Sequence, residues 1–411
     1  MRDVTKLDRI LYAPPTFLLF LLPFAHTTAL RSIAFVLTVA AAIYVWRKDH
    51  PGPAVPLKIP LALWAGMALL SLAWARNPAY SLGEIRAEIG YDIVYFLAFF
   101  ALTRDIRHWN LFRAALLAAL TVMTGIAVWL YAQTGDLNVN SRLGGVLSIS
   151  TYLVTIFPVL LVAAFEVRSD RRALGVAILA VGAALLVGYF TFNRMFILAV
   201  VACSLTIVVT MVRGRVLELA RRKALAAGVT ILLGASVLFF VSVVQRRAET
   251  DYADKMMRTS VEKDPRWAAW QFSVGLIRER PFSGVGFGLF AAEDLYRVRF
   301  KEGMERAITH AHNPFLNYAV QMGIGGLLVL VFLLLSLFRE FWKLWRAGPT
   351  QVSLIGATGL AMFVGVLLKA QPDDLWGRHN GYLFWALTGM MLGYAHRLLR
   401  EPGCASAAGS T

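Results

Sequence analysis

Charge is scarce in this chain. Charged residues make up 16% of its 411 residues, whereas soluble globular domains carry about 25%. Hydrophobic residues make up 58%, and many apolar runs reach the roughly 18–20 residues that cross a hydrocarbon core. The only two cysteines, Cys203 in an apolar run and Cys404 in the C-terminal tail, are too few and too far apart in topology to suggest a disulfide framework. The composition therefore predicts an all-α polytopic membrane protein.

Acidic residues are also few, with 25 Asp and Glu against 41 Lys and Arg, which gives a formal net charge of +16. The distribution of these charges argues against a nucleic-acid partner, because most of the basic residues lie in short loops between apolar runs, where orientation signals belong. Their bias predicts that both termini are cytoplasmic. The first apolar run lacks a small-residue cleavage site and is interpreted as a retained span.

Apolar runs between charged or turn-rich breaks give twelve candidate spans. We divide the chain into spans 1–9 within residues 1–244, a large loop at 245–314, spans 10–12 within 315–398, and a tail at 399–411. Parity places the large loop outside the cytoplasm. The twelve runs lie at 12–28, 32–46, 58–75, 89–103, 111–132, 146–165, 173–191, 194–212, 224–244, 315–338, 351–370 and 380–398.

The large loop contains two amphipathic segments. In "DPRWAAWQFSVGLIRERP", Asp264 is a plausible N-cap, Pro265 suits the first helical position, and Pro281 ends the helix. Residues 289–300 form a second piece. Aromatic side chains favour the membrane surface, so we expect this loop to rest against it. One helix face is marked by residues that recur at spacings of three and four: Trp267, Trp270, Val274 and Ile277. The first interpretation of this face is that it packs against the rest of the protein.

Histidine is rare as well, and two of the seven histidines fall in "HAHNPF" at a membrane boundary. Asn313 is a preferred N-cap and Pro314 a preferred first residue, so a helix should begin there. A helix N-terminus favours anions and disfavours protonation of a nearby imidazole. A neutral His312 could take a proton from a hydroxyl group and act as a general base.

Three arginines share the face that parity assigns to His312. They are Arg142, Arg194 and Arg266. A guanidinium group stays charged and offers a planar fork to phosphate oxygens. Together these residues predict a site for a diphosphate at the outer membrane surface, most simply one that is linked to a lipid. An arginine at a boundary can also be a membrane anchor, so the prediction depends on their convergence.

Other chemistries have weaker support. His310-x-His312 lacks two clear further ligands for zinc, and no metal or cofactor is predicted. Asp373 and Asp374 could bind Mg²⁺, although "QPDDLWG" also fits an ordinary turn. The glycine-rich "GVGFG" lacks the strand-to-helix context and the trailing Lys-Ser/Thr of a nucleotide loop.

Three stretches resemble the bacterial O-antigen ligases and the related O-antigen polymerases and protein O-oligosaccharyltransferases. They are "TFNRMFILAVV", "DPRWAAWQFSVGLIRERPFSGVGFGLF" and "HAHNPFLNYAVQMGIGGLL". The resemblance implies a GT-C-like membrane glycosyltransferase of the bacterial inner membrane that works without metal on the periplasmic side. Its donor would be undecaprenyl diphosphate-linked O-antigen and its acceptor the lipid A-core.

The resemblance also implies roles for particular residues. His312 is similar to the family's catalytic histidine, while Arg194 and Arg266 are similar to its diphosphate-binding arginines. Arg142 is similar to another basic position, with a looser local match in "NSRLGGVLSIS". Asn313, Trp270 and His310 are assigned supporting places, and His310 is an extra histidine relative to the family's motif.

Three alternatives stay open at the level of sequence. An O-antigen polymerase or a protein O-oligosaccharyltransferase would use the same donor with a different acceptor. A transporter of lipid-linked sugars is a third alternative, but it should carry polar or broken midplane helices in related halves. Most spans here are apolar and no internal repeat is evident, which favours an enzyme that works at the surface.

Overall fold

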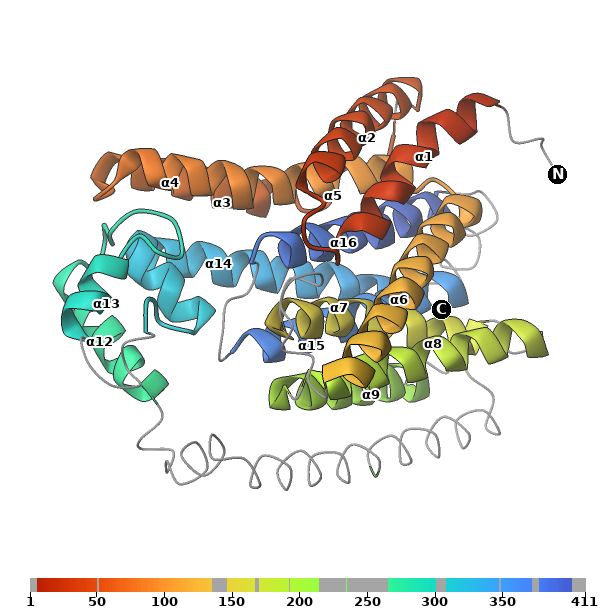
Figure 1. Cartoon of the computed structure of the whole chain (residues 1–411). Helices are drawn as coiled ribbons and strands as arrows, with labels where there is room; N and C mark the ends of the chain where they lie inside the picture. Colours follow the sequence, from red (N-terminus) through yellow and green to blue (C-terminus); the bar gives the residue numbers. More distant parts are fainter. Residues whose placement is uncertain are drawn as a thin grey trace.

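The computed structural model describes residues 6–49, 52–134, 146–166, 170–191, 193–213, 234, 265–300, 308–346, 349–371 and 377–400. Within these ranges all regular elements are helical, as Figure 1 shows. The helices are α1 (Lys6–Leu21), α2 (Thr28–Lys48), α3 (Lys58–Ser71), η1 (Leu72–Trp74), α4 (Pro78–Ile85), η2 (Arg86–Gly90), α5 (Tyr91–Leu102), α6 (Ile106–Thr134), α7 (Val146–Glu166), α8 (Arg171–Phe190), α9 (Arg194–Arg213), α12 (Pro265–Glu279), α13 (Glu293–Arg299), α14 (Pro314–Arg346), α15 (Thr350–Ala370) and α16 (His379–Leu398).

Helices occupy eleven of the twelve predicted spans. The ninth, 224–244, lies outside the described residues apart from Gly234. Six described helices are long and apolar enough to cross a membrane, which supports a multi-pass membrane protein; they are α2, α6, α8, α9, α14 and α15. The boundaries differ in places. The first helix begins at Lys6 and ends at Leu21, so the predicted span 12–28 is placed too late.

Side-chain caps explain where several helices begin. Asp105 starts α6 five residues before the predicted span, because its carboxylate accepts hydrogen bonds from the backbone N–H groups of Arg107 (2.9 Å) and His108 (3.1 Å). Asp170 caps α8 in the same way. Asn193 and Asn313 cap α9 and α14. Short polar side chains therefore fix the starts of α9 and α14, beside the predicted site residues Arg194 and His312.

Close helix packing builds the core. Gly389 of α16 lies so near α5 that a Cβ there would overlap the carbonyl oxygen of Phe96. Small residues allow such backbone approaches between helices in membranes. A buried hydrogen bond of 3.0 Å from the Trp64 indole to the Tyr318 hydroxyl joins α3 to α14. These contacts make one continuous apolar core, from which α12 and α13 project.

Helices α12 and α13 lie together beside one end of α14 (Figure 1). The start of α12 at Pro265 and its end at Glu279, before Pro281, confirm the predicted helix. A small core of their own holds them, in which Ser273 and Tyr296 hydroxyl groups lie 2.7 Å apart. Its apolar members are Ala269, Val285, Ala292, Tyr296, Phe300, Ile308 and Val320.

Candidate active site

A break in α14 anchors the segment that follows α12. Gly323 has φ 70° and ψ −170°, which interrupts the helix. A side chain there would be strained, and its Cβ would lie 2.6 Å from the carbonyl group of Phe282. At the break the Ile324 N–H donates to the Pro281 carbonyl (2.7 Å), while the Val285 N–H donates to the Val320 carbonyl (3.0 Å). Two segments thus exchange backbone hydrogen bonds.

The same exchange explains the glycines of "PFSGVGFG". Gly284 has φ 63°, and a Cβ at this position would lie 2.5 Å from the Gln321 carbonyl oxygen. The Gly286 N–H donates to that oxygen at 2.9 Å. The Gly288 N–H donates to the Gln321 side-chain oxygen at 3.2 Å. The motif is therefore a backbone docking element on α14, which fixes α12 and α13 near the start of that helix.

His310 and His312 lie against each other on the turn before α14. Their ring centroids are 3.8 Å apart with an interplanar angle of 39°. His310 is buried, shares a hydrogen bond of 3.1 Å with the Thr309 hydroxyl, and packs edge-on against Phe290. Burial, and secondarily the nearby His312, lower the pKa of His310 to about 3. His310 is therefore neutral, whereas His312 is half-buried and partly exposed at the protein surface.

The backbone of this turn is held from two sides. The Asn317 side-chain oxygen accepts a hydrogen bond of 3.0 Å from the Ala311 N–H. The Asn313 side-chain oxygen accepts from the N–H groups of Phe315 (3.0 Å) and Leu316 (3.2 Å). The predicted helix start at Asn313-Pro314 is confirmed. His312 itself has φ 48°, an uncommon conformation for a non-glycine residue, and it persists because both neighbouring residues are tied to α14.

Asn313 also links α14 to the end of α15, because its amide group donates to the Gln371 carbonyl at 3.4 Å. Arg194 lies at the same end of the bundle. Helices α9 and α15 are antiparallel: the Cys203 thiol donates to the Ala361 carbonyl (3.2 Å), while Thr210, farther along α9, accepts from Trp345 before α15 begins. The first residue of α9 therefore lies near the last turn of α15, and so on the His312 side.

Arg194 is the first residue of its helix, as predicted. Asn193 holds the start of α9 with hydrogen bonds from Met195 (3.0 Å) and Phe196 (3.3 Å), and its amide donates to the Ser150 hydroxyl of α7 (3.2 Å). The Nε atom of Arg194 is buried and has no hydrogen-bond partner among the described residues. A buried guanidinium nitrogen without a partner is an unsatisfied donor at this end of the bundle.

Arg266 lies in the first turn of α12, as predicted, and is half-buried. Trp270 follows one turn later, and no described residue accepts a hydrogen bond from its buried indole nitrogen. The packing interpretation of this helix face is wrong for Trp267, which is 50% exposed, and for Val274. Ala269 and Ser273 are the fully buried residues of this helix, and Phe272, Leu276 and Ile277 pack partly against the small core of α12 and α13.

Several residues that the sequence analysis considered are not placed by the structure. Arg142, Asp264, Asp373 and Asp374 lie outside the described residues. Within the ranges that are described, no three His, Cys, Asp or Glu side chains form a group that could hold a metal ion. His310 and His312 stack on each other, and no third ligand of these types joins them.

Sequence reasoning missed three residues of this site. Phe290 and Gln371 are brought in by tertiary contacts, and no local pattern marks them. Asn317 could have been found, because it is a polar residue one turn after Asn313 on the same side of an otherwise apolar helix.

Comparison with known proteins agrees with this geometry. Residues 178–331 match the protein-family model described as O-antigen ligase. A search of curated proteins finds no match to the chain. The matched range contains Arg194, α12, the docking segment, both histidines and the break at Gly323. Over residues 178–331, the chain is therefore similar to the O-antigen ligase family.

Proposed function

We propose that this protein is an O-antigen ligase. It transfers polysaccharide from undecaprenyl diphosphate to a sugar hydroxyl group of the lipid A-core. The reaction takes place on the periplasmic side of the bacterial inner membrane, in a GT-C-like bundle of twelve spans whose termini are both cytoplasmic. The family match supports the class of enzyme, and the positive-inside bias supports the orientation.

The observation that carries this proposal is the placement of His312. Its imidazole lies beside the capped N-terminus of α14 and stacks on His310, whose low pKa keeps it neutral. A helix N-terminus favours anions and disfavours a second positive charge. The position therefore suits a neutral histidine that accepts a proton close to a bound diphosphate.

The proposed reaction is a single displacement. His312 takes the proton from the acceptor hydroxyl, whose oxygen forms a bond to the anomeric carbon of the donor. The bond from that carbon to the diphosphate oxygen breaks, and the electron pair leaves with the diphosphate. Attack from the opposite face inverts the anomeric carbon. Arg194 and Arg266, with Arg142 as a third cation, neutralise the leaving group, so that no metal is required.

Asn313 and Trp270 have supporting roles. Asn313 fixes the backbone beside His312 through its cap, and Trp270 lies one turn after Arg266 with an indole N–H that no described residue engages. His310 is a packing partner that keeps the acting imidazole in place.

The test is transfer by purified protein from an undecaprenyl diphosphate-linked donor to lipid A-core. His312→Ala should lower the rate roughly 10²–10⁴-fold, the usual loss on removal of a general base. His310→Gln, the matched control, should retain activity within about tenfold, because His310 does not take the proton. Parental activity in His312→Ala would disprove the assignment. Loss of activity in EDTA with recovery in Mg²⁺ would direct attention to Asp373 and Asp374.

The choice of acceptor needs a separate experiment, because a polymerase or a protein O-oligosaccharyltransferase would use the same donor. Lipopolysaccharide from a deletion strain separates the alternatives. Unmodified core together with free undecaprenyl-linked long chains supports a ligase. Core that carries a single repeat indicates a polymerase, and failure to export the repeat indicates a transporter.

A further inference from the structure

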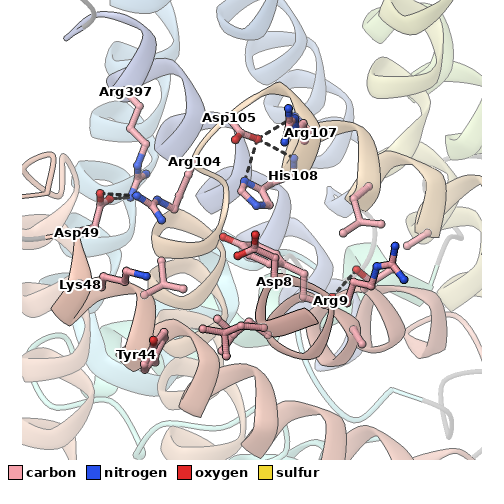
Figure 2. A pocket seen from close by; sticks show the side chains of 18 of the residues that line it. Asp8, Arg9, Tyr44, Lys48, Asp49, Arg104, Asp105, Arg107, His108 and Arg397 are labelled. Carbon is pink, nitrogen blue, oxygen red and sulfur yellow. Dashed lines mark hydrogen bonds and ion pairs between the residues drawn. The ribbon is translucent and has the colours of Figure 1, made fainter. Parts of the chain in front are cut away.

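A large cavity lies between α1, α2 and α6 (Figure 2), and neither His310 nor His312 lines it. Its volume of about 1360 Å³ exceeds the roughly 300–1,000 Å³ of pockets for drug-sized ligands. The end of α16 closes it, so that it is separated from the His312 end by a helix of 20 residues, about 30 Å long. All of its lining residues lie outside the segment 178–331 that matches the family model.

One end of the cavity carries an excess of positive charge. Asp49 receives both Arg104 (2.9 Å) and Arg397 (3.1 Å), and Figure 2 shows the two guanidinium groups side by side at this carboxylate, with Lys48 next to them. One negative charge thus faces three cations. Over the whole lining, six Lys and Arg side chains face three Asp side chains, a net charge of +3; the cations are Arg9, Lys48, Arg104, Arg107, Arg397 and Arg400.

A second carboxylate in the lining is already engaged. Asp105 caps α6 and pairs with His108 at 2.9 Å. The hydrogen bond from His108 is the main cause that lowers the pKa of Asp105 to about 2. Asp105 therefore interacts within its own turn. Its carboxylate does not neutralise the positive charge of Lys48, Arg104 and Arg397.

The other end of the cavity is apolar. It follows α1 from Arg9 to Phe20, about 16 Å at the helical rise of 1.5 Å per residue, with Ala114 and Ala118 of α6 opposite. Tyr12 lies on this same stretch of α1 and is 5% exposed, and its buried hydroxyl group has no hydrogen-bond partner among the described residues. The cavity thus joins a cationic end, an unused hydroxyl group and an apolar channel as long as a helix of three turns.

We infer that this cavity binds an anionic phospholipid of the bilayer. Its phosphate lies at Lys48 and Arg104, where the nearby Arg397 adds positive charge while its own terminal N–H groups donate to Asp49 and to backbone carbonyls, and an acyl chain follows the apolar channel between α1 and α6. Guanidinium groups suit phosphate oxygens, and basic side chains at a membrane surface attract anionic lipid. A free anion would leave the apolar channel without a ligand, and a zwitterionic lipid would leave the excess charge uncompensated. This inference does not depend on the proposed transferase activity.

The test is native mass spectrometry of the purified full-length protein titrated with phosphatidylglycerol or phosphatidylcholine. Phosphatidylglycerol should bind about tenfold more tightly or better. The double variant Lys48→Gln/Arg104→Gln should weaken phosphatidylglycerol binding roughly 30-fold, the effect of two basic contacts at a membrane surface. The matched control Arg47→Gln/Arg339→Gln removes the same charge from exposed positions outside the lining and should leave binding unchanged.

A second variant tests the apolar end. Ala118 is exposed on α6 and lines the channel, so Ala118→Phe fills it without disturbing the core. This variant should weaken phosphatidylglycerol and leave thermal stability without added lipid unchanged. Equal binding of both lipids, or unchanged binding in Lys48→Gln/Arg104→Gln, would overturn the inference. Displacement of the lipid by millimolar inorganic phosphate, with Ala118→Phe still binding normally, would assign the cavity to a free anion and also overturn it.

Discussion

His310 supports His312 by direct ring contact, with 3.8 Å between the ring centroids. The two residues have opposite surroundings. His310 is buried behind Phe290, whereas His312 is only half-buried. The extra histidine of "HAHNPF" therefore packs against His312, and its neutrality removes a positive charge that would otherwise lie against the His312 imidazole.

The low pKa of His310 predicts acid sensitivity. Its pKa is about 3 in the folded protein against 6.5 for an ordinary histidine. Between these values the unfolded chain binds a proton that the folded chain does not, so the free energy of unfolding should decrease as the pH falls through this window. The slope is at most about 1.4 kcal/mol per pH unit. In thermal unfolding across this range, His310→Gln should give a flatter profile, and so should His310→Asn. An unchanged profile in both variants would contradict the prediction.

The cap of α14 should matter for both stability and activity. Asn313→Ala removes the acceptor for two N–H groups and should cost about 1 kcal/mol of unfolding free energy, and it should also slow transfer because His312 loses its fixed backbone. Asp170→Ala removes an equivalent cap from α8 at the other end of the bundle. It should cost similar stability with little effect on the rate. Equal rate losses in the two variants would show that only global stability is at stake.

The docking of the "PFSGVGFG" segment depends on Gly323. Gly323→Ala places a side chain at positive φ and against the Phe282 carbonyl, which should cost about 1–3 kcal/mol. Limited proteolysis should then cut within residues 265–300 more readily than in the parent protein. Gly182→Ala is the control, since this helical glycine has open space around it and should be neutral or slightly stabilising. Unaltered protection of residues 265–300 in Gly323→Ala would refute the docking role.

The assignment of Arg194 to a diphosphate predicts that lysine cannot replace it. Arg194→Lys keeps the charge but loses the planar fork, and the rate should fall roughly 10–100-fold, the value of one or two charge-assisted hydrogen bonds. Arg278→Lys, at an exposed position in the last turn of α12, should retain the parental rate. Full activity of Arg194→Lys would indicate a membrane anchor. Steady-state transfer kinetics with the lipid-linked donor measure both variants.

Local chemistry made much of this structure predictable. Asn313-Pro314 and the pair Pro265 and Pro281 mark helix ends through caps and missing N–H groups, which depend only on neighbours in the sequence. The break at Gly323 was not predictable from local sequence. Its hydrogen-bond partners lie in the segment before α13, about 40 residues earlier in the chain. The packing of Trp267 was predicted wrongly, because periodicity gives a shared face but not which face is buried.

The lipid cavity was beyond the sequence for a related reason. Its cations come from α1, α2, the turn before α6 and the end of α16, and only the tertiary fold gathers them. The overall excess of basic residues was visible, and the positive-inside rule was enough to account for it. A charge pattern that serves orientation can therefore hide a ligand site.

The exchange at Gly323 has a consequence for biogenesis. Pro281 and Val285 leave the ribosome before α14, yet their backbone partners are Ile324 and Val320 within that helix. The docking segment cannot reach its final conformation until α14 has entered the membrane. The backbone groups at the break in α14 cannot form their hydrogen bonds until the segment has arrived. The docking segment and α14 must therefore mature together, after translation of both.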